Sequence, residues 1–398
     1  MSAPDNAEGE ARGDSNITAA SPLAGMRVLD LSRVLAGPYA TMLLGDLGAD
    51  VWKIERPGYG DETRAWGPPF VCGTSAYYLS ANRNKRSAAL DFGDAGHRAA
   101  ILRAAAAADI VVENYLPGTL ARHGLDAATL RAVNPALVVC SITGFGQDGP
   151  YAQLPGYDAV MQGFVGLQSI TGEAHGPPIK VGVALVDVLT GIHAATAILA
   201  ALVGRLRSGR GAHLDVAMHE VGVHALVNVS QSALSTGQPA RRHGNAHPTI
   251  VPYQTFAAAD GLLVLAVGND GQWSRVCEAM GEPERARDER FVTNPGRLEH
   301  RAEVVGWLGR RIGAEPVSTW VERFRRHGVP AGPVREMLDV VRDPALAARG
   351  MVGTHRFADG GETALFSLPW LADGRRAPVR RVPPALGEHT AEFFAEYG

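Results

Sequence analysis

The sequence predicts an α/β protein with a large parallel-sheet domain and a smaller α+β domain. Over the first two hundred residues, short apolar segments alternate with helical segments. Near residue 243 this alternation gives way to a hairpin-like segment and then to three helical stretches. Strands that alternate with helices are typical of a parallel sheet with helices on its faces, and the change of pattern indicates a second domain.

The elements of the large domain are assigned in chain order. Strands are expected where the chain has short apolar runs, at 26–32, 49–55, 87–92, 109–115 and 136–143. Helices are expected at 39–48 and 97–108. A turn at Gly37-Pro38 precedes the first helix, whose unpaired N–H groups would suit a phosphate or a carbonyl oxygen.

The smaller domain is expected to begin with a hairpin. Residues 255–267 are typical of two strands that turn at Asp260-Gly261, and helices are expected near 272–280, 302–312 and 317–327. We expect a disordered tail at 1–21, the large domain at 22–225, the small domain at 226–330 and a segment rich in Pro, Gly and Arg at 331–398.

Composition argues against several classes of protein. A net charge of −3 argues against a general nucleic-acid binder. Cys72, Cys140 and Cys277 have neither disulfide nor metal-site spacing, which favours a reducing, cytoplasmic compartment. Residues 1–21 lack the features of a secretion signal, and the longest apolar stretch, 194–204, is shorter than the roughly 20 residues of a membrane span. We therefore expect a soluble protein with no nucleic-acid, membrane or metal partner.

One acidic residue interrupts an apolar run. Asp187 lies in VGVALVDVLTG, just ahead of a long helical stretch. We expect 181–186 to be extended and Thr190 to cap the helix, so that Asp187 lies just outside the helix N-terminus. There the helix dipole would favour the ionised carboxylate while apolar neighbours exclude water, which suits a nucleophile. A carboxylate that only caps the helix is the alternative.

Seven segments, in order along the chain, resemble those of class III coenzyme A transferases, the CaiB/BaiF family. They are PLAGMRVLDLSRVLAGP and its continuation to residue 64, then 81–87 (ANRNKRS), 109–118 (DIVVENYLPG), 141–151 (SITGFGQDGPY), 155–162 (PGYDAVMQ), 181–191 and 384–390 (PALGEHT). In this family the acid that carries the acyl group falls in the segment that contains Asp187. The resemblance also implies a Rossmann-like large domain, a C-terminal segment that returns to it, and an interlocked homodimer.

The resemblance further implies a coenzyme A site. Positions that match contacts in similar enzymes are Arg56, Asn114 and Arg122 for the nucleotide half, and Leu35 and Ala36 for the pantetheine arm. Arginine suits phosphate because its planar group donates two hydrogen bonds at once. Lys85 and Arg86 are further candidates, although surface cations are commonly only solvated. No tightly bound cofactor is implied, because coenzyme A thioesters would be substrates.

The resemblance implies that acyl-CoA and a free carboxylic acid react through an aspartyl anhydride and an aspartyl-CoA thioester on Asp187. Two alternatives remain: a racemase or epimerase of 2-methylacyl-CoA, and a noncatalytic acyl-CoA binding protein. Racemases of this family carry a histidine where this chain has Tyr157, and tyrosine is a poor base at neutral pH. We expect Tyr157 and Asp158 to hold their loop by hydrogen bonds.

The identity of the acid rests on one stretch, 243–261. It resembles the corresponding stretch of members that move CoA from succinyl-CoA to dicarboxylic acids such as glutarate. We expect succinyl-CoA as donor and a short dicarboxylate as acceptor, with carnitine-like, formate or oxalate, and aromatic acids as alternatives. A second carboxylate needs a cation or a polar partner, for which Arg33, Arg64 and His247 are candidates. Gly244 lies in a loop that could close over the site.

Overall fold

The computed structural model describes residues 18, 19 and 21–398, and the chain divides into two compact units. The large unit contains the chain up to Leu167 together with Val181–Thr236 and Pro344–Gly398, and the small unit contains Gln168–Lys180 and Gly237–Asp343. These boundaries differ from the expected ones at 226 and 331, and no pattern in the sequence indicates that 168–180 belongs to the small unit. The expected tail at 1–21 lies almost entirely outside the described residues.

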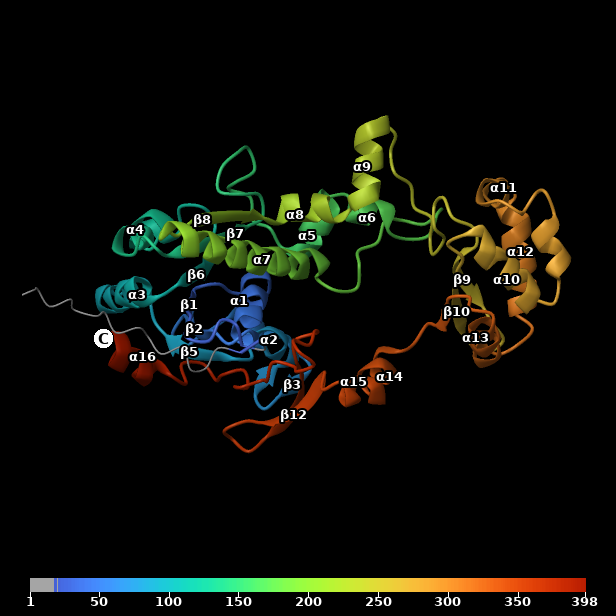
Figure 1. The fold of residues 1–398 in the computed structure, drawn as a ribbon. Helices are drawn as coiled ribbons and strands as arrows, with labels where there is room; N and C mark the ends of the chain where they lie inside the picture. The colour runs from blue at the N-terminus through green and yellow to red at the C-terminus, as the bar shows by residue number, and fades with distance from the viewer. Residues whose placement is uncertain (1–17, 20) are drawn as a thin grey trace, which may run out of the picture. The chain divides into compact units, whose positions relative to one another are not determined.

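The large unit is built on a six-stranded sheet (Figure 1). Its strands, in spatial order, are β5 (Lys85–Ala89), β2 (Asp50–Glu55), β1 (Arg27–Asp30), β6 (Ile110–Glu113), β7 (Val138–Thr143) and β8 (His213–Ala217). Every neighbouring pair is parallel. The predicted α/β fold with a parallel sheet is therefore confirmed, and the sequence missed only the edge strand β8 of this sheet.

Helices cover both faces of the sheet (Figure 1). One face packs against α1 (Ala36–Asp46) and α7 (Leu185–Ser208), and the other against α3 (Ala95–Ala107), α4 (Ala127–Val133) and α16 (Thr390–Tyr397). Side chains alternate along each strand, so Val28 of β1 joins the first core and Leu29 joins the second. The sheet is consequently buried on both sides.

Shorter elements complete the large unit. The helices are η1 (Glu62–Ala65), α2 (Ala76–Ala81), η2 (Leu120–His123), α5 (Asp158–Phe164), α8 (Met218–Ala225), α9 (Val227–Thr236) and α15 (Pro344–Ala348), and α6 (Leu167–Ile170) begins at its boundary. Two hairpins join β3 (Phe70–Val71) to β4 (Thr74–Ser75) and β12 (Val352–Arg356) to β13 (Glu362–Phe366). The last helix, α16, places Phe393 against Trp52 of β2, with ring centroids 5.1 Å apart. The C-terminal segment thus packs on the sheet.

The small unit has a three-stranded antiparallel sheet with helices on it. Its strands are β9 (Tyr253–Ala257), β10 (Leu262–Ala266) and β11 (Ala331–Pro333). Its helices are α10 (Asp270–Ala279), η3 (Pro283–Arg287), α11 (Asn294–Glu299), α12 (Arg301–Ile312), α13 (Val317–Arg326) and α14 (Met337–Val341). Trp273, Trp307 and Phe324 form the centre of its core. The expected hairpin corresponds to β9 and β10, and the three expected helices to α10, α12 and α13.

Helix α7 is longer and more apolar than the sequence suggested. Its length and composition would suffice to cross a membrane, which the short stretch at 194–204 did not indicate. Ala194, Ile198 and Leu202 of α7 are buried in the core between the helix and the sheet. Core helices of soluble proteins meet the same criterion, so α7 is weak evidence for a membrane span.

Candidate active site

Asp187 lies in the first turn of α7, inside the helix. Residues 181–184 precede the helix without forming a strand, so the expected extended segment at 181–186 is wrong. The expected cap is wrong too, because Thr190 lies within α7 and its hydroxyl donates to the carbonyl oxygen of Val186 at 2.7 Å. The residue at the N-cap position is Ala184, which has no side chain able to accept a hydrogen bond.

Asp158 supplies the missing cap from another helix. Its Oδ1 accepts hydrogen bonds from the backbone N–H groups of Val186 at 2.8 Å and Asp187 at 3.3 Å. Its Oδ2 accepts a bond from Nε2 of Gln162 at 2.6 Å. A side chain 29 residues earlier in the chain thus satisfies the N–H groups that an N-cap residue normally binds. This role was not foreseen from the sequence.

The environment of Asp187 opposes ionisation. Burial raises the pKa of the Asp187 carboxyl, and the negative charge of Asp158 raises it further, to about 7. The helix N-terminus was expected to favour the charged form of Asp187, but the loss of hydration outweighs that effect here. A carboxyl group that titrates near neutral pH is suited to react as a base or a nucleophile.

A cavity of about 160 Å³ opens beside Asp187. Sequence-predicted residues that line it are Arg33, Leu35, Ala36, Asn114, Tyr157 and Asp187. They come from the turn before α1, the end of β6, the loop before α5 and the start of α7. The structure therefore brings the candidate nucleophile, the expected pantetheine-binding turn and Tyr157 together.

The turn before α1 is held in an unusual conformation. Val34 has a φ of 68°, a left-handed conformation that a β-branched residue rarely adopts. The Val34 N–H points to the Asp61 carboxylate, at 3.2 Å from its Oδ2. Asn114 accepts a bond from the Arg33 N–H at 2.9 Å and donates one to the Arg33 carbonyl at 2.7 Å. These contacts fix the backbone that leads to Leu35.

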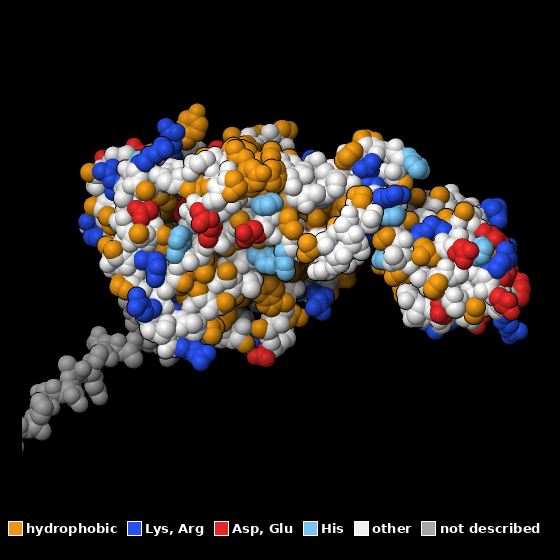
Figure 2. Space-filling view, turned by 90° about the horizontal axis from the view of Figure 1, so that it is seen from above, with side chains coloured by type: hydrophobic (Ala, Val, Ile, Leu, Met, Phe, Trp, Pro, Cys, Tyr) orange, Lys and Arg blue, Asp and Glu red, His pale blue; other side chains and the backbone are white. Residues whose placement is uncertain are grey.

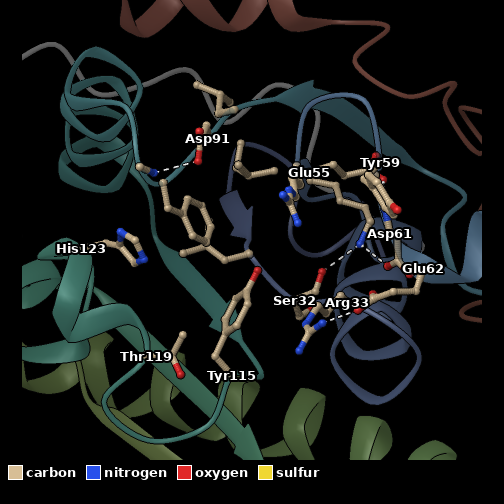
Figure 3. Close-up of a pocket in the computed structure, with 18 residues that line it drawn as sticks. Ser32, Arg33, Glu55, Tyr59, Asp61, Glu62, Asp91, Tyr115, Thr119 and His123 are labelled. Atoms are coloured by element: carbon tan, nitrogen blue, oxygen red, sulfur yellow. Dashed lines mark hydrogen bonds and ion pairs between the residues drawn. The ribbon is translucent and has the colours of Figure 1, made fainter.

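A larger cavity, of about 410 Å³, lies at the carboxyl ends of β1, β2, β5 and β6 (Figure 3). Strand order reverses between β1 and β6, because β2 and β5 lie on one side and β7 and β8 on the other. Ligands of open parallel sheets bind at such a point. Arg33 and Tyr115 line both this cavity and the one beside Asp187. Figure 3 shows Tyr59, Tyr115 and His123 around the larger cavity and Arg33 paired with Glu62.

The predicted nucleotide contacts are only partly brought together. Arg56 lines the larger cavity, where its guanidinium lies 5.5 Å from the ring centre of Tyr59. Asn114 lines only the smaller cavity, and its amide group is engaged with the Arg33 backbone. Arg122 is exposed and lines neither of the two, although its neighbour His123 lines the larger one. Arg56 is therefore the predicted phosphate ligand that the geometry favours.

Two other predicted cations have structural partners instead. Lys85 is fully buried, and its ammonium donates to Asp30 at 3.0 Å, to the Pro38 carbonyl at 2.8 Å and to Asn82 at 3.0 Å. Its three N–H donors are thus satisfied, and burial lowers its pKa to about 8. Arg86 stacks 3.6 Å from the ring centre of Trp52 and binds Glu396 at 2.8 Å. Because neither lines a cavity beside Asp187 or Arg56, their expected contact with coenzyme A is not supported by this geometry.

The candidates for binding a second carboxylate differ in whether they face the cavity of Asp187. Arg64 is committed to Glu55, with nitrogen–oxygen distances of 2.6 and 2.8 Å, and to the Pro384 carbonyl at 3.1 Å. Arg33 binds Glu62 but is half-exposed and faces both cavities. His247 and Gly244 belong to the small unit, where His247 packs 5.4 Å from the ring of Tyr253 and Gly244 has a φ of 58°. Their expected roles as substrate or lid residues stay predictions.

Two residues near the site were missed from the sequence. Burial raises the pKa of Tyr77 to about 12, with Asp187 and Asp158 adding to the shift, which puts this hydroxyl in the electrostatic field of the candidate nucleophile. Lys53 is buried in the larger cavity wall and pairs with Asp61 at 2.9 Å. Tyr77 adjoins a second tyrosine, and Lys53 lies in an apolar strand, so the sequence offered no signal for either role.

Comparison with known proteins identifies the class to which this fold and site belong. The model of CoA-transferase family III matches residues 23–390. The chain belongs to this family and is a CoA-transferase by class, as the sequence resemblance implied.

Individual members of the family are similar to this chain over almost its whole length. The chain is 44% identical over 386 residues to succinate–glutarate CoA-transferase of Agrobacterium fabrum, covering 94% of this chain and 95% of that protein. It is 40% identical over 385 residues to human succinyl-CoA:glutarate CoA-transferase, covering 97% of this chain and 88% of that protein. A CAIB/BAIF family protein from Brucella suis has a similar crystal structure, with a TM-score of 0.85 and 41% identity over 95% of this chain and all of that one. Relatives named for CoA transfer between dicarboxylic acids thus resemble the chain over nearly its full length.

Proposed function

We propose that this enzyme transfers CoA from succinyl-CoA to a short dicarboxylic acid, with Asp187 as the nucleophile. The observation that carries the proposal is the placement of Asp187: a buried carboxyl with a pKa near 7 in the wall of a cavity, facing the fixed turn at 33–36. The similarity to glutarate-specific transferases supports the choice of donor and acceptor class.

The first half-reaction replaces the carboxylate of the donor by that of Asp187. An oxygen of Asp187 attacks the thioester carbonyl, so that a C–O bond forms, the C–S bond breaks and CoA leaves as a thiolate. The thiolate then attacks the Asp187 carbonyl of the mixed anhydride, which forms aspartyl-CoA and releases succinate. Each covalent step divides one difficult displacement into easier ones.

The second half-reaction runs the same steps in reverse with the acceptor. The acceptor carboxylate attacks aspartyl-CoA and releases the thiolate, and the thiolate then attacks the acceptor carbonyl of the new anhydride. The products are the acceptor's CoA ester and a free Asp187 carboxylate. No water is consumed, so exclusion of water from the cavity keeps the acyl group activated throughout.

The two cavities suit the two ends of a CoA thioester. The larger one offers Arg56 for phosphate and the rings of Phe92 and His123, whose centroids lie 6.1 Å apart, for a flat base. The smaller one holds Asp187 for the thioester end. Because Arg33 and Tyr115 line both, we place the pantetheine arm along them, past Leu35 and Ala36.

Arg33 is our candidate for recognising the far carboxylate of a dicarboxylic acid. Its guanidinium is half-exposed, faces the cavity of Asp187 and lies 5.1 Å from the ring centre of Tyr115. Glu62 already pairs with it, so a substrate carboxylate would share or displace that partner. A planar guanidinium can donate to two carboxylates at once.

In the part of the chain that the structure describes, no comparable arrangement of side chains supports racemisation. It needs a base on each face of the α carbon. Among the described residues that line the cavity of Asp187 there is no histidine, and Tyr157 occupies the position where racemases of this family carry one.

The proposal is tested by incubating the enzyme with succinyl-CoA and separate acids: glutarate, mesaconate, oxalate, carnitine and benzoate. We expect a new CoA ester with one of the dicarboxylates and none with Asp187→Asn. Deuterium uptake at the α carbon of 2-methylacyl-CoA without new esters would instead indicate racemisation. Binding of succinyl-CoA without either product would indicate a noncatalytic protein.

A further inference from the structure

Asp158 has no chemical role in the transfer steps, yet its side chain is buried against the nucleophile. It is 9% exposed, as is Asp187. Its oxygens accept hydrogen bonds from Val186 N, Asp187 N and Gln162 Nε2, so it acts only as an acceptor, as an ionised carboxylate does. A second charge placed this close to a nucleophilic carboxylate requires a physical explanation.

Gln162 fixes the position of that charge. Besides its bond to Asp158, its Nε2 donates to the Val183 carbonyl at 3.0 Å, and its Oε1 accepts from the Val181 N–H at 2.8 Å. Gln162 is fully buried and lies one helical turn after Asp158 in α5. The pair therefore holds both the segment that enters α7 and the first turn of α7.

We propose that Asp158 is a positioning residue whose fixed negative charge destabilises the free Asp187 carboxylate relative to its two covalent intermediates. This inference rests on the proposed function. When Asp187 attacks the thioester, its charge passes to the departing CoA thiolate, and the anhydride linkage left on Asp187 carries no charge. When the thiolate returns, the charge leaves with the succinate, and the thioester linkage on Asp187 carries no charge either. Repulsion between Asp158 and Asp187 is present in the free enzyme and absent in both intermediates.

The titratable groups around Asp187 support this assignment. From α5, Asp158 is the charge that adds to burial in raising the Asp187 pKa to about 7. From α2, Tyr77 lies in the field of both carboxylates and stays protonated at neutral pH, with a pKa of about 12. Arg33 lines the same cavity but is paired with Glu62. Asp158 is therefore the charge that disfavours ionised Asp187, and the more basic carboxylate that results is the better nucleophile.

The test compares removal of the Asp158 charge with loss of the hydrogen bonds that the Gln162 side chain makes. Asp158→Asn keeps a side-chain oxygen that can cap α7 but removes the charge. Gln162→Ala keeps the Asp158 charge but removes the hydrogen bonds from Gln162 to Asp158 and to the segment that enters α7. Asp126→Asn is the matched control, because Asp126 caps α4 through the N–H groups of Ala128 and Thr129, each at 3.1 Å. Each variant is mixed in excess with succinyl-CoA, and single-turnover release of succinate is measured from about pH 5 to 9.

Asp158→Asn should release succinate at least about tenfold more slowly than the wild type at high pH. The acid limb of its pH–rate profile should shift to lower pH. Gln162→Ala should be slower with the acid limb in place, and Asp126→Asn should behave as the wild type. An unchanged rate, or a slower rate with an unmoved acid limb in Asp158→Asn, would overturn the inference. Should that variant not fold, Asp158→Ser removes the charge while keeping a capping hydroxyl and gives the same test. Wild-type enzyme that releases no succinate would instead overturn the proposed function and this inference with it.

Discussion

At the scale of single residues, Asp187 shows a conflict between stability and reactivity. Its folded-state pKa of about 7 is above the ordinary 3.8, so the folded chain binds this proton more tightly than the unfolded chain. The stability that this protonation contributes is present in full below about pH 4 and is lost as the pH rises through about 7. The enzyme therefore keeps its nucleophile at a cost in stability at the pH where it is ionised.

Asp187→Asn should consequently be more stable than the wild type at alkaline pH. We expect its free energy of unfolding to be higher by roughly 3 kcal/mol near pH 8, and the difference to shrink towards pH 4. Urea unfolding of both proteins across this range measures the effect. Equal stabilities at pH 8 would show that Asp187 is not held in an unfavourable environment.

Arg56 makes a separate prediction, about binding. Because it lines the larger cavity and has no ion-pair partner among the described residues, Arg56→Ala should weaken CoA binding about tenfold with a small effect on kcat. Arg86→Ala is the matched control, since Arg86 pairs with Glu396 and stacks on Trp52 away from this cavity. Calorimetric titration with CoA measures both, and a larger loss of affinity in Arg86→Ala would contradict the assignment.

The sequence could identify Asp187 as a candidate but not the residues that shift its pKa. An acid inside an apolar run can be recognised from the sequence, whereas the cap from Asp158 depends on a contact between residues 29 positions apart. The burial of Lys85 was not foreseen for a related reason: Lys85 lies in a polar motif, NRNKRS, yet it begins strand β5 and is buried beside Asp30. Neither burial nor a long-range ion pair can be derived from local composition.

At the scale of elements, predictions held where the hydrophobic pattern is strong. The apolar strands β1, β2, β6 and β7 and the alanine-rich α3 lie where periodicity placed them. The edge strand β8 was missed because its sequence, HLDVA, has two exposed polar residues and only a short apolar pattern. The run at 181–186 resembled a strand because it is apolar, although Gln162 holds Val181 ahead of α7 and Asp158 holds Val186 in the first turn of α7.

The contact between α1 and α7 depends on a glycine. A Cβ at Gly191 would lie 2.7 Å from the Ala36 carbonyl and 3.1 Å from the Tyr39 ring. Gly191→Ala should therefore push the first turns of α7 away from the turn at 33–36, destabilise the protein by about 1–3 kcal/mol and lower kcat. Thermal unfolding and turnover with succinyl-CoA measure the two effects.

Gly204 provides the control within the same helix. A Cβ at Gly204 would meet nothing within 4 Å, so Gly204→Ala should stabilise α7 by about 0.5–1 kcal/mol through helix propensity and leave turnover unchanged. If both variants lost activity equally, the loss would reflect α7 in general and not its approach to α1.

At the scale of the whole molecule, the topology explains why CoA and the nucleophile are expected side by side. The reversal of strand order between β1 and β6 opens the larger cavity, and the loops that leave these two strands, at 31–36 and 114–119, also line the smaller one. The cavity at the reversal follows from the fold class, whereas its continuation to Asp187 depends on the contact between Asn114 and Arg33. The family resemblance implied that the pantetheine arm passes Leu35 and Ala36 towards Asp187, which the strand pattern alone could not predict.

The resemblance also predicts a homodimer, and the surface of the large unit gives a physical reason for one. Val203 and Leu206 near the end of α7 are 60% and 80% exposed, and Leu234 of α9 is 82% exposed. Figure 2 shows hydrophobic side chains gathered on part of the surface of the large unit. Large apolar side chains left exposed on a chain often mark an interface. We expect light scattering at micromolar concentration to give about twice the 42.0 kDa of one chain, and Leu206→Asp to weaken this association. A mass of one chain for the wild type would contradict the dimer, whereas a dimer that Leu206→Asp leaves intact would place the interface on another surface.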